Sequence, residues 1–104
     1  MARYLRHAGF ELAEFQGLNL DYDRQMSRVS PAFLVEFACA IDRPEADAVL
    51  LSCGALRSLE VVERIEQRLG KPVVTSNQAM LWHCLRLAGI EDRIEGHGRL
   101  LRRF

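Results

Sequence analysis

The residue best suited to chemistry in this sequence is Cys53, which directly follows a short apolar run and precedes Gly54. A thiol at the end of a buried strand, in front of backbone N–H groups and a helix start, can react as a thiolate nucleophile. Glycine lets the backbone approach a ligand closely, so the Gly54 N–H would be able to hold a carboxylate or enolate oxygen. The alternative is that Cys53 is a small buried hydrophobic residue, and its spacing taken alone favours this alternative.

A second polar segment, Thr75-Ser76-Asn77, follows the next short apolar run. Ligands of open parallel sheets bind outside the carboxyl ends of the strands, so we expect this segment and residues 52–58 to face one pocket. Cys39 and Cys84 lie inside helical patterns, which favours a structural role. No histidine has a partner at metal-binding spacing, and neither a GxGxxG nor a P-loop pattern for phosphate is present.

Alternating helices and short strands are predicted to position these segments. Helices are expected over 2–8, 31–41, 59–69 and 75–88, strands over 10–15, 47–52 and 71–74, and a loop with a turn of helix over 17–30. Ser30-Pro31 and Thr75–Gln78 are helix-start signals. This order predicts an α/β fold of three layers, with a parallel sheet of about three or four strands and helices on both faces.

The apolar spacing also predicts which helical residues face the core. In the helix over 31–41 these are Phe33, Leu34, Phe37 and Ile41. In the last long helix they are Ala79, Trp82, Leu85 and either Leu87 or Ala88. Gly70 and Gly89 stand where glycine ends helices.

Composition limits the classes of function. The chain has 104 residues, enough for one domain, with 49% hydrophobic residues and a formal net charge of zero. Balanced charge gives no electrostatic reason to expect a nucleic acid or an anionic membrane as partner. No stretch reaches the roughly 20 apolar residues of a membrane helix. Three cysteines without CxxC spacing argue against a disulfide framework, so a reducing, cytoplasmic location is expected.

Two segments resemble motifs of the aspartate/glutamate racemase superfamily, in the branch that holds maleate cis-trans isomerases and arylmalonate decarboxylases. They are ADAVLLSCGALRS at 46–58 and GKPVVTSNQA at 70–79, the latter followed by LWH at 81–83. The likeness runs from about Tyr4 to Leu101. It implies a Rossmann-like half of a two-domain enzyme that uses no cofactor and no metal. The active site of such an enzyme lies between two similar halves, each of which can supply a cysteine.

The resemblance implies roles for five residues of this chain. Cys53 would be the catalytic cysteine of the second half, and the Gly54 N–H would help to bind a substrate carboxylate. Thr75 and Ser76 would line the adjacent pocket wall, and Asp23 would lie near a loop position that touches substrate. Maleate isomerases tend to carry asparagine near that position, and a desolvated carboxylate there would repel a dicarboxylate.

The function that the resemblance implies is that of the C-terminal half of a cofactor-independent isomerase, of the maleate isomerase type, acting on a small carboxylic acid through a cysteine. The alternatives are an arylmalonate decarboxylase-like or racemase-like half, or a non-catalytic truncated α/β domain. The first half, and the first strand of the second half, are expected to be missing.

Two parts of the chain are expected to differ in their packing. Residues 1–90 would form the α/β domain, and 91–104 a tail that packs on the first half in relatives. Leu100, Leu101 and Phe104 would then lack a partner within the chain. We therefore expect a homo-oligomer or a missing N-terminal half to cover them.

Overall fold

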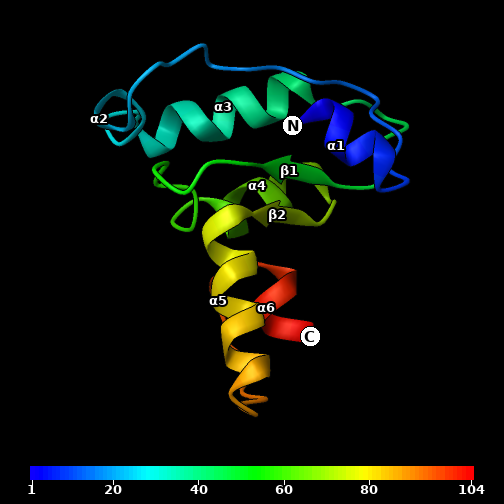
Figure 1. Cartoon of the computed structure of the whole chain (residues 1–104), viewed down its shortest axis with the longest axis vertical. Helices are drawn as coiled ribbons and strands as arrows, with labels where there is room; N and C mark the ends of the chain where they lie inside the picture. Colours follow the sequence, from blue (N-terminus) through cyan, green and yellow to red (C-terminus); the bar gives the residue numbers. More distant parts are fainter.

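Two short strands form the sheet of the computed structural model, which describes residues 1–104 (Figure 1). β1 (Val49–Leu51) and β2 (Val73–Thr75) run parallel, with Val49 opposite Val73 and Leu51 opposite Thr75. Helix α4 (Val62–Leu69) connects them. The predicted α/β class and the pairing of these two strands are confirmed, whereas the predicted sheet of three or four strands is wrong.

Residues 10–15, predicted as a strand from their alternating pattern, form no strand. The N–H groups of residues 11–20 donate to no backbone carbonyl group. An alternating segment becomes a strand only where a neighbouring strand supplies hydrogen-bond partners, and β1 pairs with β2 alone. The segment therefore runs beside the body of the molecule without regular structure.

The helices begin and end near their sequence signals. Besides α4, they are α1 (Ala2–His7), α2 (Asp23–Met26), α3 (Pro31–Ile41), α5 (Ser76–Leu87) and α6 (Arg99–Arg103). The Ser30 hydroxyl accepts a hydrogen bond from the Phe33 N–H at 3.1 Å, as its capping position predicts. Gly70 adopts a left-handed conformation with φ of 69° and ends α4. α4 itself begins at Val62 rather than near Leu59.

The core lies between α3, α4 and the sheet. Its main members are Leu34, Val35, Ala38, Val49, Leu51, Val61, Val62, Ile65 and Val73. Phe33, predicted to face inward, is 48% exposed, whereas Val35 and Ala38 are buried. Glu36 is the only charged residue in α3, so spacing alone does not define the buried face of this helix.

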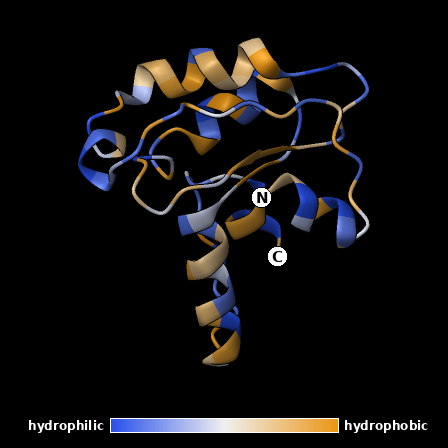
Figure 2. Cartoon of the chain, turned by 45° about the horizontal axis from the view of Figure 1, so that its top comes forward, coloured by the Kyte–Doolittle hydropathy of each residue, from blue (hydrophilic) through white to orange (hydrophobic).

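α5 projects away from the sheet, and α6 packs beside it (Figures 1 and 2). Trp82 and Leu85 are partly buried as predicted, but Leu87 is 75% exposed. Leu101 of α6 is fully buried, so the structure differs from the expectation that this side chain lacks a partner within the chain. Phe104 is 69% exposed. The oligomeric state and the place of the tail in relatives stay predictions.

No helix of the structure is both long enough and apolar enough to cross a membrane.

Candidate active site

Cys53 lies just beyond the end of β1 and lines a cavity of about 240 Å³. Its Sγ is 3.3 Å from the Sδ of Met26 in α2. The other walls come from residues 16–20, from Leu34 and Phe37 of α3, and from Leu56. Ten of the fourteen lining residues are hydrophobic and none is charged. Cys53 is partly buried, so its thiol stands in an apolar cavity that a ligand can reach.

The two segments that follow the strands lie together, as their order in the sequence predicts. The side chain of Asn77 joins them, because its Nδ2 donates to the carbonyl oxygen of Gly54 at 3.1 Å and to that of Leu56 at 3.4 Å. The carboxyl ends of neighbouring parallel strands meet at one edge of the sheet. Asn77 therefore positions the backbone that carries Cys53 and Gly54.

Backbone donors next to Cys53 are unoccupied. The N–H groups of Gly54 and Ala55 donate to no acceptor within the chain. Gly54 is exposed, and a Cβ at this position would lie 3.6 Å from Oδ1 of Asn77, which is an ordinary contact. Two successive N–H groups beside a thiol can bind a carboxylate or a developing oxyanion.

Of the five predicted site residues, only Cys53 lines this cavity, and Gly54, although next to it in the chain, does not. Thr75 is fully buried, and its hydroxyl accepts the N–H of Gln78 at 3.2 Å as the cap of α5. Ser76 begins α5 and is partly buried. Asp23 begins α2 and is exposed, one helical turn before Met26. The substrate-binding roles of these three residues and of Gly54 stay predictions, as does the catalytic role of Cys53.

Sequence reasoning missed Met26 and the loop over 16–20. Met26 is 27 positions from Cys53, and no local pattern reports a contact over that distance. The loop has no periodicity, so nothing in its composition indicates that it covers the thiol. To predict this contact from the sequence, one would have to know which loop the fold places beside the end of β1.

Charged groups near this edge of the sheet pair with each other. The guanidinium of Arg57 donates to the carboxylate of Glu60, with Nε 2.7 Å from Oε1. This hydrogen bond lowers the pKa of Glu60 and raises the pKa of Arg57, and both side chains are exposed. No group of three or more metal-binding side chains gathers in the structure.

Comparison with known proteins gives a consistent result at the level of sequence. The family model of arylmalonate decarboxylase matches residues 1–101. The chain is 42% identical to the arylmalonate decarboxylase of Bordetella bronchiseptica over 78 residues. These residues are 72% of this chain and 32% of that protein. It is 32% identical to the maleate isomerase of Pseudomonas putida, over 97% of this chain and 41% of that protein.

Solved structures of the same kinds of protein resemble the fold. A maleate isomerase of Pseudomonas putida S16 superposes with a TM-score of 0.91 and 25% identity, over 97% of this chain and 41% of that chain. An arylmalonate decarboxylase gives a TM-score of 0.84 and 35% identity, over 96% of this chain and 45% of that chain. A mutant of the Nocardia farcinica maleate cis-trans isomerase, with a covalently bound succinylcysteine intermediate, gives a TM-score of 0.88 and 28% identity. This match covers 96% of this chain and 41% of that chain. The chain spans less than half the length of each relative.

Proposed function

The chain belongs to the arylmalonate decarboxylase family, and from that premise we propose that it is the cysteine-bearing half of an enzyme that acts on a small carboxylic acid. The observation that carries this proposal is the position of Cys53. Its thiol faces a cavity, and the two N–H groups after it are free to bind an oxygen atom of the substrate. The Nocardia relative with a succinylcysteine intermediate supports a cysteine as the reacting group.

Two reactions use this arrangement. In a cis-trans isomerase, the Cys53 thiolate adds to one alkene carbon and the electron pair moves onto the neighbouring carbon and its carboxylate. Rotation about the resulting single bond and cleavage of the C–S bond release the trans product. In a decarboxylase, a carboxylate leaves as CO₂, and the carbanion that remains, delocalised as an enediolate, takes a proton from the Cys53 thiol. In both reactions the N–H groups of Gly54 and Ala55 hold the developing negative charge.

The lining of the cavity favours the second reaction. Maleate and a substituted malonate both carry two carboxylates, but only the malonate also carries an apolar substituent, which gains from burial against Leu34, Phe37 and Leu56. The sequence-based expectation placed the maleate isomerase first. We propose that the preferred substrate carries an apolar group beside its carboxylates.

A chimaera tests the proposal. Residues 1–104 replace the equivalent segment of the Bordetella arylmalonate decarboxylase, and the product is assayed with phenylmalonate for CO₂ release and with maleate for fumarate formation. Cys53→Ala should lower the rate by on the order of a hundredfold to ten-thousandfold, as removal of a catalytic acid or base does. Cys84→Ala, at an exposed cysteine of α5, is the matched control and should leave the rate unchanged.

The substrate that is turned over distinguishes the two reactions, and the Cys53→Ala variant tests the role of the thiol. Turnover of phenylmalonate without turnover of maleate supports the decarboxylase version, and the reverse supports the isomerase. A folded chimaera in which Cys53→Ala retains the full rate would overturn the assignment of Cys53.

A further inference from the structure

The loop that carries Cys53 closes as a tight turn. The N–H of Leu56 donates to the carbonyl oxygen of Cys53 at 3.4 Å, and neither of the two residues between them, Gly54 and Ala55, has a positive φ. A closing hydrogen bond with negative φ at both central positions is the pattern of a type I turn. The backbone of such a turn resembles the first turn of a helix, where the N–H groups face the side chain of the first residue and the carbonyl groups face the other way. The unoccupied N–H of Ala55 therefore lies on the side of the Cys53 side chain.

Asn77 holds the opposite, carbonyl side of this turn. Its Nδ2 donates to the carbonyl oxygens of both Gly54 and Leu56, and these two acceptors decide which end of the amide faces the turn. The Gly54 carbonyl and the Ala55 N–H belong to one trans peptide unit, in which they point in opposite directions. A side chain that fixes the direction of the Gly54 carbonyl therefore also fixes the direction of the Ala55 N–H.

The side chain of Asn77 projects from a firm part of the chain. Asn77 is the second residue of α5, between the partners of a capping box: the Thr75 hydroxyl accepts the N–H of Gln78 at 3.2 Å, and Oε1 of Gln78 accepts the N–H of Thr75 at 3.3 Å. Both partners are fully buried. The turn at 53–56, by contrast, is closed by a hydrogen bond longer than the usual range of about 2.7–3.2 Å. Its shape therefore depends on the bonds from Asn77.

The bond from Asn77 also changes the strength of the Ala55 N–H as a donor. Hydrogen bonds in a chain polarise one another, so a donor on the carbonyl of a peptide makes the N–H of the same peptide more positive. A donor that is already aimed and polarised needs no reorganisation when negative charge develops on a substrate.

We propose that Asn77 is a positioning residue of the candidate site: through the Gly54 carbonyl it aims the Ala55 N–H at a carboxylate oxygen beside the Cys53 thiol and strengthens it as a donor. The effect on turnover rests on the proposed function. The effect on an anion that approaches Cys53 requires no turnover, so the two are tested separately.

Alkylation of the cysteines tests the anion-directing role in the chain itself. Iodoacetate carries a carboxylate and iodoacetamide is neutral, but both react with the same thiolate. The ratio of their rates at one cysteine therefore cancels the ionisation and the accessibility of that thiol and reports how its surroundings treat a carboxylate. The ratio is measured at Cys53 and at the exposed Cys84 by mass spectrometry of peptides, in the parent, Asn77→Ala, Asn77→Ser and Ser30→Ala.

Asn77→Ala and Asn77→Ser should lower the ratio of iodoacetate to iodoacetamide at Cys53 by about threefold or more, as loss of part of a hydrogen bond to a charged group does. The ratio at Cys84 should not change. Ser30→Ala is the matched control, because it removes a helix cap outside the lining of the cavity, and it should leave both ratios unchanged. Circular dichroism identifies variants that remain folded.

A Cys53 ratio that is the same in the parent and in a folded Asn77 variant would overturn the proposal. The parent alone gives a second test that needs no variant: the Cys53 ratio should fall in concentrated urea, where the turn is lost, and an unchanged ratio would also overturn the proposal.

The chimaera described above tests the effect on turnover. Asn77→Ala should lower kcat by about tenfold to a hundredfold, which is less than the loss when an oxyanion donor is removed outright. KM should change by less than about threefold, because the better aim matters most when the charge has developed. A rise in KM at unchanged kcat would overturn this role. If Cys53→Ala retains the full rate, the proposed function fails, and the alkylation ratio still decides whether Asn77 directs an anion to Cys53.

Discussion

The two ends of the chain are held in opposite ways. In the C-terminal region, buried polar side chains bind the backbone of neighbouring elements: Glu66 of α4 accepts the N–H of Val73 at 3.0 Å and that of Arg99 at 2.9 Å. Gln78 of α5 donates from Nε2 to the carbonyl oxygen of His97 at 2.6 Å. In the N-terminal region, by contrast, no residue before Leu34 is buried.

This difference distinguishes a wall of the candidate site that is held by packing, the firm wall, from a wall that few contacts hold. β1, β2 and the loop held by Asn77 form the firm wall, because α4, α5 and α6 all pack against β2. Residues 16–20 form the other wall of the cavity at Cys53, and few hydrogen bonds fix them. Segments with few buried contacts open at low free energy. We therefore expect opening of this cavity to involve residues 16–20 rather than the loop held by Asn77.

Gly98→Ala should break the C-terminal region most severely. Gly98 has φ of 85°, and a Cβ there would stand 2.3 Å from Cγ1 of the buried Val62 and 2.8 Å from Nε2 of Gln78. Left-handed strain and overpacking together should cost about 3–5 kcal/mol in the free energy of unfolding, measured by urea denaturation. Gly96→Ala is the matched control: its φ is 83°, but nothing lies within 4 Å, so strain alone should cost about 1–2 kcal/mol. Equal losses in the two variants would contradict close packing at Gly98.

Glu66→Ala should come next in size. The carboxylate is 4% exposed, and its removal leaves the N–H groups of Val73 and Arg99 without an acceptor. Each buried unsatisfied donor costs about 1–3 kcal/mol, so the free energy of unfolding should fall by about 2–4 kcal/mol. Glu36→Ala, which removes an exposed partner of Arg68, should cause little change. A small effect at Glu66 would mean that water replaces its hydrogen bonds.

The same contrast separates what the sequence predicts well from what it does not. Caps and glycine helix ends are local signals, and Ser30, Thr75 and Gly70 occupy the predicted positions. The meeting of the loops after β1 and β2 follows from the parallel order of strands alone. These features need only neighbours in the sequence or the general chirality of the fold.

The failures lie where a distant partner decides the outcome. Residues 10–15 have the pattern of a strand, but hydrogen bonds of a sheet require a second strand beside them. The buried face of α3 depends on where α4 packs, so Phe33 is exposed while Val35 is buried. The contact of Met26 with Cys53 depends on the course of an irregular loop. None of these partners can be inferred from local spacing.

Low pH should loosen the C-terminal region through Glu63. The N–H of Gly98 donates to this carboxylate, and Arg102 pairs with it, so the pKa of Glu63 is lowered in the folded chain. A lowered pKa stabilises the folded state above the unfolded value of about 4.3, and this contribution is lost as pH falls through the folded value. Glu63→Gln should lower the thermal midpoint at pH 6, and the difference from the parent should shrink as pH falls through the folded value. Glu45→Gln, at an exposed residue without an ion pair, should follow the parent across the same pH range.

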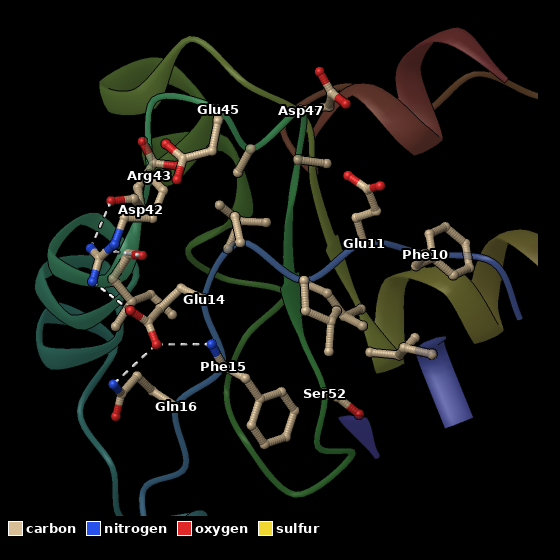
Figure 3. Close-up of a pocket in the computed structure, with 18 of the residues that line it drawn as sticks. Phe10, Glu11, Glu14, Phe15, Gln16, Asp42, Arg43, Glu45, Asp47 and Ser52 are labelled. Carbon is tan, nitrogen blue, oxygen red and sulfur yellow. Dashed lines mark hydrogen bonds and ion pairs between the residues drawn. The ribbon is translucent and has the colours of Figure 1, made fainter. Parts of the chain in front are cut away.

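The smallest effects should come from the apolar residues of the N-terminal region. Phe10 is 62% exposed and Phe15 is 49% exposed, and both line an open cavity between residues 9–17 and β1 rather than the core (Figure 3). Phe10→Ser and Phe15→Ser should each change the free energy of unfolding by less than about 0.5 kcal/mol, as surface substitutions do. A loss of about 2 kcal/mol in either variant would show that the N-terminal segment packs as core, and the contrast between the two regions would fail.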